Sequence, residues 1–420
     1  MKADWDFVTI GDIATVKGGK RVPKGYKLEA KPTAHPYITV SDFTDSGTVS
    51  SEKIRYIRDE VYEVIKNYTI SSEDVYISIA GTIGKTGSIP PELEGANLTE
   101  NACKLILNGS IHKYYLLYFM QSDSFERQTG INTRIAAQPK LALTRLKTIE
   151  LPLPPLSEQK QIVAILGKAF EGIDKAIANT EKNLSNAREV FESYLNNVFT
   201  QKGEGWMEKK LGEMAAEFGR GKSKHRPRNA KFLYGGDYPF VQTGDIRNSN
   251  HYITNYTQTY SEEGLKQSKL WSKGTVCITI AAHIAETGIL TFDGCFPDSV
   301  IGMTPDPQKT LSGYIEYLLQ FFRADLQKKG KGTVQDNINL GTFKEQVFPF
   351  APLPEQRRIV AMLDTLAEKT RRLESNYQQK LQALNELKQS LLQKAFSGEL
   401  TANFEHQEVI ELPKLGHVIC

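Results

Sequence analysis

The sequence predicts an α+β protein with two globular α/β units and two long helices that pair within the chain as an antiparallel coiled coil. Three observations predict this fold. A Pro-rich segment occurs twice, at 154–166 and at 351–363, and each copy opens a long charged stretch. Apolar residues recur every three or four positions along both stretches, as in a coiled coil. A segment with short β-rich runs precedes each stretch, so we expect the two halves to be related by a pseudo-twofold axis.

The repeat covers most of the chain. Three upstream segments recur downstream in the same order: 5–14 as 206–215, 37–43 as 240–246, and 75–80 as 276–281. In the helical stretches the register pairs Leu184 with Leu381 and Phe199 with Phe396. A period this long is not that of a solenoid and indicates a duplicated half-protein. The predicted segments are a globular unit, a helix, a second unit, a second helix and a tail, at 1–152, 153–200, 201–350, 351–400 and 401–420.

Composition and charge limit the class of protein. A chain of 420 residues is long enough for two or three domains, and a hydrophobic content of 40% suits a soluble globular protein. No stretch approaches the ~20 apolar residues of a membrane span, and the N-terminus is too polar for a signal peptide. The four cysteines lack CxxC spacing and nearby histidines, which indicates neither disulfides nor zinc. We therefore expect a cytoplasmic protein with no membrane contact and no metal site.

Two sets of apolar residues define the predicted coiled-coil seam. Their spacing indicates a partner helix rather than burial in a globular core. The second set follows the same pattern with a one-residue slip near Leu381. The first set is Val163, Leu166, Phe170, Ile173, Ile177, Leu184, Phe191 and Val198. The second set is Ile359, Leu363, Leu366, Leu373, Tyr377, Leu384, Leu387 and Leu391.

The ends of the two helical stretches carry residues that are typical of helix termini. Ser157 is the predicted N-cap of the first helix, and Pro354 suits the first turn of the second. Glu158 and Glu355 favour the positive end of each helix dipole. A helix of about 42 residues is a rod of roughly 63 Å. Because the first rod leads to the second unit and the second rod leads back, two rods in contact must be antiparallel.

Basic residues cluster in glycine-containing loops at equivalent places in the two halves. The first loop contains Lys17, Lys20, Arg21, Lys24 and Lys27, and the second spans 220–231. The net charge of +3 is too small to indicate nucleic acid by itself. One such cluster is typical of a solvated loop. Two clusters at equivalent repeat positions favour contact with phosphates, which lysine and arginine neutralise.

No catalytic residues are predicted. Lys85 follows Gly84, but a P-loop needs glycine six residues before its lysine, where Ile79 stands. The two Pro-Pro pairs have the wrong neighbours for the loop of a DNA-amine methyltransferase. No Glu-x-Lys follows closely after the Pro-Asp pairs, as a metal-dependent restriction nuclease would require. A Gly-x-Ser-x-Gly motif is absent, so nucleophilic hydrolysis is not indicated.

The order of these features resembles the specificity subunit of type I restriction–modification enzymes. The segments that carry the resemblance are 151–159 (LPLPPLSEQ), 351–356 (APLPEQ), 81–87 (GTIGKTG) and 394–400 (KAFSGEL). The second half departs from the pattern at 281–286, where the Gly-Thr-Ile-Gly-Lys run is missing. The resemblance covers nearly the whole chain, and its order and spacing are specific although no single motif is.

The resemblance implies that each globular unit is a target recognition domain for one half of a bipartite, asymmetric site in double-stranded DNA. The helices would set the spacer between the half-sites and dock two modification subunits, which methylate adenine N6. Two restriction subunits would add ATP-driven translocation and cleavage. The resemblance implies no cofactor in this chain, since S-adenosylmethionine, ATP and Mg would be bound by the partner subunits.

The predicted DNA contacts are basic or polar residues in loops, because phosphate contacts fix the register and side chains in the groove read the bases. In the first half they are Lys20, Arg21, Lys24, Thr39, Ser41, Lys85 and Arg134. In the second half they are Lys222, Lys224, Arg226, Thr243 and Asp245. Two other classes of function stay open at this point. One is a single-chain DNA methyltransferase or nuclease, against which the missing motifs argue, and the other is a structural coiled-coil adaptor with two protein-binding heads.

Overall fold

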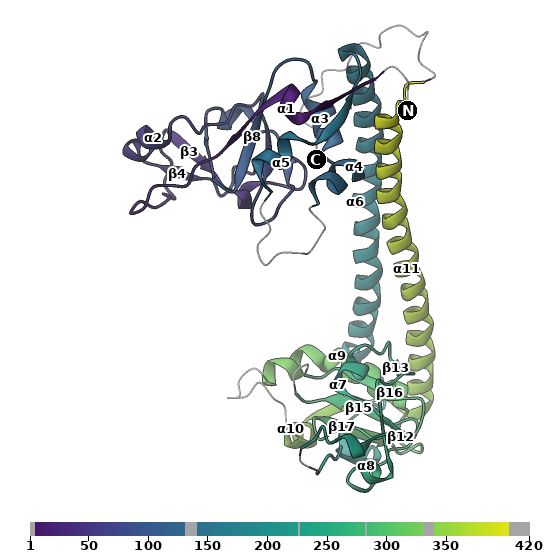
Figure 1. Ribbon diagram of the computed structural model, residues 1–420. Coiled ribbons are helices and arrows are strands. Elements are labelled where there is room, and N and C mark those ends of the chain that lie inside the picture. Colours follow the sequence, from purple (N-terminus) through teal and green to yellow (C-terminus); the bar gives the residue numbers. More distant parts are fainter. Residues whose placement is uncertain (1–4, 131–140, 226, 282–283, 331–339, 403–420) are drawn as a thin grey trace. The chain divides into compact units, whose positions relative to one another are not determined.

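The computed structural model describes residues 5–130, 141–225, 227–281, 284–330 and 340–402. The chain forms two compact units. Unit 1 contains residues 1–182 and 377–420, and unit 2 contains residues 183–376. Each unit holds one globular part and one half of each long helix (Figure 1). The predicted division into five segments, with each helix in one piece, stays a prediction.

The described part of unit 1 contains three small sheets. Its strands are β1 (Asp6–Thr9), β2 (Ala14–Gly18), β3 (His35–Ile38), β4 (Arg55–Ile57), β5 (Val75–Ser78), β6 (Thr86–Gly87), β7 (Asn97–Leu98), β8 (Ala102–Leu107) and β9 (Glu150–Leu153). Its short helices are α1 (Ile10–Ile13), α2 (Asp59–Ile65), α3 (Lys113–Phe119), α4 (Asp123–Thr129) and α5 (Leu143–Lys147), with 3-10 turns η1 (Val40–Asp42) and η2 (Pro91–Leu93). The strands join in the orders β2-β8-β5-β6, β4-β3-β7 and β1-β9.

The described part of unit 2 contains three sheets as well. Its strands are β10 (Met207–Lys210), β11 (Ala215–Arg220), β12 (Tyr234–Phe240), β13 (Tyr252–Ile253), β14 (Gln258–Tyr260), β15 (Val276–Thr279), β16 (Thr287–Leu290), β17 (Val300–Pro305) and β18 (Val347–Phe350). Its shorter helices are α7 (Thr243–Arg247), α8 (Glu262–Lys266), α9 (Ser312–Gly330) and α10 (Leu340–Glu345), with 3-10 turns η3 (Leu211–Glu213) and η4 (Lys231–Leu233). The strands join in the orders β11-β17-β15-β16-β13, β12-β14 and β10-β18.

The two units share one topology. The four-strand order β2-β8-β5-β6 of unit 1 recurs as β11-β17-β15-β16 in unit 2, and the pair β1-β9 recurs as β10-β18. The central strands β5 and β15 are buried at every position, which explains why both are short apolar runs rather than alternating ones. The predicted α+β class and the duplicated architecture are therefore confirmed.

The long helices α6 (Leu156–Thr200) and α11 (Leu353–Ser397) each span 45 residues. In unit 1, Phe170 from the first half of α6 shares a buried cluster with Leu392 from the last half of α11. In unit 2, Phe199 from the last half of α6 shares a cluster with Leu363 from the first half of α11. The two helices therefore run antiparallel where they pack in each unit, as predicted.

Most of the predicted seam residues are buried or half-buried, and two are not. Among the buried ones are Val163, Leu166, Phe170, Ile173, Ile359 and Leu363. The half-buried ones are Ile177, Leu184, Phe191, Val198, Leu366, Tyr377, Leu384 and Leu391. The prediction was wrong for Leu373 and Leu387, which are 43% and 47% exposed. The next residue in each case, Glu374 or Lys388, takes the inward position because it meets a charged partner on α6.

These two polar positions form ion pairs between α6 and α11. In unit 2, Arg188 Nε donates to Glu374 Oε1 at 2.7 Å. In unit 1, Lys388 Nζ pairs with the carboxylate of Asp174. Such pairs add little stability when they are exposed to solvent, but polar residues at seam positions can fix the register and the partner of a helix pair.

The first turns of each long helix are buried in the globular part of the same unit. Ile162, Val163 and Leu166 belong to one cluster with Tyr115 and Leu151. The rings of Phe170 and Tyr118 meet edge to face, with their centroids 5.4 Å apart. The sequence assigned this face to a partner helix alone, and that expectation was wrong. The reason is that α6 begins directly after β9, so its first turns lie against the core that β9 completes.

A buried glutamine connects the start of each long helix to the globular part of its unit through hydrogen bonds. Gln159 is fully buried, and its Oε1 accepts from His112 N at 2.7 Å while its Nε2 donates to Pro154 O at 2.8 Å. Gln356 is also fully buried, and its Oε1 accepts from Thr310 Oγ1 at 2.9 Å while its Nε2 donates to Ala351 O at 2.8 Å. The repeated Glu-Gln pair in the sequence is thus a structural motif.

The glutamate of each Glu-Gln pair accepts a hydrogen bond from the tryptophan near the start of the same half of the chain. Glu158 accepts from Trp5 Nε1 at 3.1 Å and from Thr401 Oγ1 at 2.6 Å, so both ends of the described chain meet at one carboxylate. In unit 2, Glu355 accepts from Trp206 Nε1 at 3.2 Å. The predicted N-cap Ser157 was wrong, because α6 begins one residue earlier, at Leu156. Pro354 lies in the first turn of α11, as predicted.

We expect Gln159→Ala to lower the free energy of unfolding by about 2–4 kcal/mol. The substitution leaves the His112 N–H and the Pro154 carbonyl without their partner, and each unpaired buried group costs ~1–3 kcal/mol. Urea unfolding of the full chain, followed by circular dichroism, measures the loss. Gln161→Ala is the matched control, since Gln161 is exposed on the same helix. Equal stability of the two variants would contradict this role of Gln159.

Candidate nucleic-acid interface

The basic loop of unit 1 follows β2. Lys20, Arg21 and Lys24 are all exposed on it. The start of the loop is held by backbone contacts: Lys20 N donates to Leu98 O at 2.8 Å, and Tyr37 Oη donates to Lys20 O at 2.8 Å. A fixed backbone with basic side chains in solvent suits binding of a charged surface from outside.

A glycine brings this loop close to the rest of the unit, and unit 2 repeats the arrangement. A Cβ on Gly19 would lie 2.1 Å from Thr99 O, and a Cβ on Gly221 would lie 2.3 Å from Phe296 O. Because no side chain fits at these distances, only glycine allows the approach. The residues that follow, Lys20 and Lys222, therefore occupy equivalent positions.

An acidic residue holds an arginine of the loop in unit 1. Arg21 Nε donates to Glu100 Oε1 at 2.5 Å, although the arginine side chain is largely exposed. Partial burial by itself would raise the pKa of the Glu100 carboxyl, but the hydrogen bond from Arg21 and further contacts lower this pKa overall. Glu100 thus stays charged and orients the guanidinium.

Unit 2 has an acid at the matching place. Asp298 Oδ2 accepts from Arg228 Nη2 at 2.8 Å, and Asp298 O accepts from Arg220 Nε at 2.7 Å. Lys222 and Lys224 are exposed beside these arginines. Neither Glu100 nor Asp298 is predictable from the sequence, since each lies some 70 or more residues from its arginine and no local motif marks it.

The polar turns predicted to face DNA are capped turns. In unit 1, Thr39 Oγ1 donates to Asp42 Oδ2 at 2.7 Å and lies 2.8 Å from the hydroxyl of exposed Ser41. In unit 2, Thr243 begins α7, and Asp245 Oδ2 accepts from Gln242 N at 2.8 Å. The carboxylate of Asp245 therefore caps a turn, and this role explains it better than contact with a phosphate, which carries the same charge.

Lys85 has partners within unit 1. Its Nζ donates to Phe43 O at 3.2 Å and pairs with Asp45 Oδ1 at 2.8 Å. The hydrogen bond and the charge of Lys85 lower the pKa of the Asp45 carboxyl. Two predicted contacts, Arg134 and Arg226, lie outside the described residues. For all of the predicted residues, contact with DNA stays a prediction.

A shallow hollow of about 290 Å³ adjoins the loop of unit 1. Its lining includes Lys17, Tyr68 and Lys104. Lys20 Nζ lies 5.6 Å from the centre of the Tyr68 ring, and Lys104 Nζ pairs with Asp74 Oδ2 at 3.0 Å. Tyr68 and Lys104 are not predictable from the sequence as neighbours of this loop, because their positions in the chain lie far from the basic cluster.

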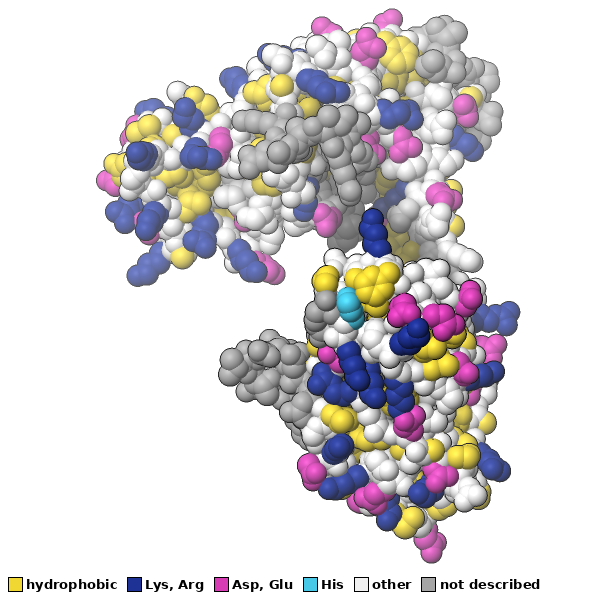
Figure 2. Space-filling model, turned by 60° about the horizontal axis from the view of Figure 1, so that its bottom comes forward, with side chains coloured by type: hydrophobic (Ala, Val, Ile, Leu, Met, Phe, Trp, Pro, Cys, Tyr) yellow, Lys and Arg dark blue, Asp and Glu magenta, His cyan; other side chains and the backbone are white. Residues whose placement is uncertain are grey.

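Basic side chains are also found beyond the two loops. Figure 2 shows Lys and Arg side chains at the end of unit 1 that carries β3, β4 and α2, and others over the middle of the visible face of unit 2. Exposed residues at that end of unit 1 include Lys53, Arg55 and Lys66. Among the described residues, no group of three His, Cys, Asp or Glu could hold a metal ion, and no helix is apolar enough over a sufficient length to cross a membrane.

Comparison with solved structures shows the same fold. A chain from a structure that addresses complex assembly and conformational transition of the type I R-M system gives a TM-score of 0.75 at 21% identity, covering 94% of this chain and 98% of that one. The HsdS subunit of Thermoanaerobacter tengcongensis gives a TM-score of 0.56 at 21% identity, covering 95% of this chain and 98% of the subunit.

Comparison of sequences gives the family. The EcoBI specificity subunit of Escherichia coli, a type I restriction enzyme subunit, is 23% identical over 437 aligned positions, which cover 95% of this chain and 87% of that protein. The family described as type I restriction modification DNA specificity domain matches twice, over residues 2–184 and 203–383. These two matches follow the duplication of basic loop, sheet and helix described above, and the chain belongs to the type I restriction–modification DNA specificity family.

Proposed function

We propose that this chain is the specificity subunit of a type I restriction–modification complex, in which each unit reads one half of a bipartite, asymmetric site in double-stranded DNA. The observation that carries the proposal is the basic loop that occurs once in each unit. Glycine places the loop backbone identically, and an acid orients an arginine beside it. Two such loops suit two half-sites, each with its own phosphates.

The loops divide the work of recognition between phosphates and bases. Exposed Lys20, Lys24, Lys222 and Lys224 neutralise phosphates and so set the affinity. The hydroxyls of Thr39, Ser41 and Thr243 lie on capped turns, whose fixed backbone lets a short side chain point at a base edge. The bases read by each unit depend on these turns.

The outer faces of the long helices dock the partner subunits. Val190 on α6 and Leu387 on α11 are equivalent in the repeat register, and they are 57% and 47% exposed. Apolar residues at two equivalent exposed positions suit two copies of one partner. The partners in this proposal are two modification subunits, which methylate adenine, and two restriction subunits, which join the assembled complex.

The chain itself serves as a non-catalytic subunit of this complex, in the cytoplasm. Its relatives carry the name of specificity subunits, which supports a role in recognition. S-adenosylmethionine, ATP and Mg are bound by the partner subunits in this proposal. The target base is flipped out of the duplex into a pocket of the modification subunit, so the specificity subunit needs no pocket of its own.

Lys222→Ala and Lys224→Ala should each weaken binding of the complex to all DNA sequences alike. Each loss of a phosphate contact should lower the slope of log affinity against log salt by about one. Fluorescence anisotropy with duplex DNA at several salt concentrations measures both effects. Lys273→Ala is the control, since Lys273 is also exposed but lies away from the basic loop. It precedes the start of β15, whereas the basic loop of unit 2 lies near the end of that strand. Unchanged affinity in both loop variants would refute the assignment.

Exchange of residues 206–347 for the corresponding unit of a homologue should change only one half of the recognised sequence. The reason is that each unit has its own core, its own basic loop and its own buried glutamine at the start of a long helix. Methylome sequencing of cells that carry the reconstituted complex reads out the site. A chimera that recognised an unrelated, continuous sequence would show that the units do not read independently.

Removal of seven residues from each helix should move the half-sites closer while their sequences stay the same. Deletion of 178–184 and 378–384 shortens the paired helices by roughly 10 Å, or about three base pairs of 3.4 Å. Both cuts fall between the ion pairs Asp174–Lys388 and Arg188–Glu374, so each pair stays in its register. Methylome sequencing of the variant gives the new spacer.

A cut of three residues from each helix is the matched control. It rotates the downstream seam out of register, so the complex should no longer assemble. An in-phase variant that assembles, methylates DNA and keeps the original spacer would show that the helices do not set the distance between half-sites.

A further inference from the structure

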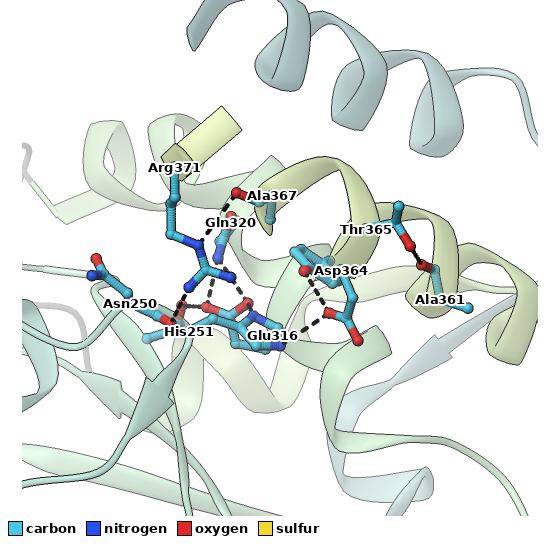
Figure 3. A network of polar contacts seen from close by, with 11 residues as sticks. Asn250, His251, Glu316, Gln320, Ala361, Asp364, Thr365, Ala367 and Arg371 are labelled. Carbon is cyan, nitrogen blue, oxygen red and sulfur yellow. Dashed lines mark hydrogen bonds and ion pairs between the residues drawn. The ribbon is translucent and has the colours of Figure 1, made fainter. Parts of the chain in front are cut away.

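Unit 2 contains a buried polar network that has no counterpart at the equivalent positions of unit 1. Figure 3 shows residues of this network from the segment before β13, helix α9 and helix α11, and Thr287 of β16 contributes a further hydrogen bond. The network centres on His251, whose side chain is 8% exposed. Because buried polar groups cost stability unless they are paired, the partners of His251 decide what the network costs.

His251 occupies a position at which unit 1 has glycine. Gly47 O accepts from Ser88 N at 3.1 Å, and His251 O accepts from Ile289 N at 2.9 Å. The two donors are equivalent, because each directly follows the matching glycine of its strand, in β6 or in β16. Both residues are left-handed, with φ of 75° at Gly47 and 73° at His251. Glycine adopts this conformation freely, whereas histidine is strained in it. The imidazole must therefore make contacts that offset the strain.

The first of these contacts is to Glu316 of α9, which is 1% exposed. His251 Nδ1 lies 2.5 Å from Glu316 Oε2, and Thr287 Oγ1 and Gln320 Nε2 donate to the same carboxylate at 2.8 and 2.7 Å. In unit 1 the equivalent of Glu316 is Leu117. Each lies two residues after a tyrosine, Tyr115 or Tyr314, whose hydroxyl donates to a proline carbonyl. Histidine and glutamate thus replace glycine and leucine together.

The second contact is to Asp364 of α11. His251 Nε2 lies 3.8 Å from Asp364 Oδ1, and Tyr317 Oη donates to the same oxygen at 2.7 Å. The ring of Tyr317 stacks on His251 at 4.5 Å. The repeat register places Gly167 of unit 1 at the position of Asp364, next to the hydroxyl of Tyr118. A third element has therefore also gained a charged group in unit 2.

Arg371, one turn further along from Ala367, reaches the same segment. Its Nη1 donates to Asn250 O at 3.5 Å, and its Nε donates to Ala367 O at 3.3 Å. The segment Asn250–Tyr252 is thus held from α9 by the Glu316 carboxylate and from α11 by the Arg371 guanidinium, and the Asp364 carboxylate lies 3.8 Å from the imidazole (Figure 3). This segment directly follows α7, which carries the predicted DNA-facing residue Thr243.

We propose that His251 is a positioning residue for DNA recognition by unit 2: it fastens the segment between α7 and β13 to α9 and α11, and so fixes the turn that reads the second half-site. The inference rests on the proposed function of the chain. Unit 1 holds its corresponding turn through Gly47 without this fastening. The second half-site should therefore depend on His251, and the first should not.

The test uses the full chain in complex with its modification subunits, and the target found from the methylome of the wild-type complex. The measured quantity is discrimination, the Kd for DNA with one half-site scrambled divided by the Kd for intact DNA. It is determined for each half-site in turn. The variants are His251→Gly, which copies Gly47 and relieves the strain, and His251→Asn. Asparagine tolerates the left-handed conformation and keeps an N–H donor near the place of Nδ1.

His251→Gly should lower discrimination at the half-site of unit 2 by roughly 3–30-fold, with discrimination at the other half-site unchanged. His251→Asn should restore most of the loss. A purely structural role would lower the active fraction for every DNA alike and leave both ratios unchanged. Equal ratios in His251→Gly and the wild type, or an equal fall at both half-sites, would overturn the proposal.

Asp364→Gly copies Gly167 and leaves Glu316 paired, so it provides a second route if His251→Gly does not fold. It should lower the same ratio in the same direction by a smaller factor, and no change would count against the proposal. The proposed function is tested separately in the same experiment. If the wild-type complex fails to prefer the intact site over either scrambled site, that function fails, whereas loss of preference confined to the variant supports the role of His251.

Discussion

The buried glutamine at the start of each long helix is the interaction on which the rest of the fold depends. Gln159 and Gln356 each use both a donor and an acceptor inside the core, where water cannot replace a lost partner. The amide joins the Pro-rich turn, the first helical turn and the segment before α3 or α9. The direction of the helix relative to the globular part of its own unit follows from this joint, and the packing of the first helical turns follows in turn.

The two basic loops combine a fixed backbone with exposed charges. Close packing at Gly19 and Gly221 fixes the backbone, and Glu100 and Asp298 orient neighbouring arginines. The loop lysines are exposed to solvent, which suits the proposed contact with phosphates whose exact position varies along a duplex. Fixed backbone and exposed charge are thus separated by residue type within a short stretch of chain, an arrangement that suits the proposed recognition of DNA.

The sequence was sufficient for the architecture because the repeat, the heptads and the Pro-rich turns are local patterns. It was insufficient at Leu373 and Leu387, since heptad spacing alone does not show that Glu374 and Lys388 have charged partners on α6. The basic loops were predictable from composition, whereas Glu100 and Asp298 were not, because they meet the loops only in the folded chain. The network of His251 joins three distant segments and has no motif, so only comparison of the two folded units reveals it.

The two ion pairs of the long helices also favour the pairing of α6 with α11 over the pairing of either helix with a copy of itself. In the repeat register Phe191 of α6 stands where α11 has Lys388, and Ile177 stands where α11 has Glu374. A pair of α6 helices in this register would set Asp174 against a phenyl ring and Arg188 against an aliphatic side chain. A pair of α11 helices would bring Lys388 against Arg371, two like charges. Pairing of α6 with α11 therefore brings opposite charges together within each unit, whereas pairing of either helix with a copy of itself in this register would not.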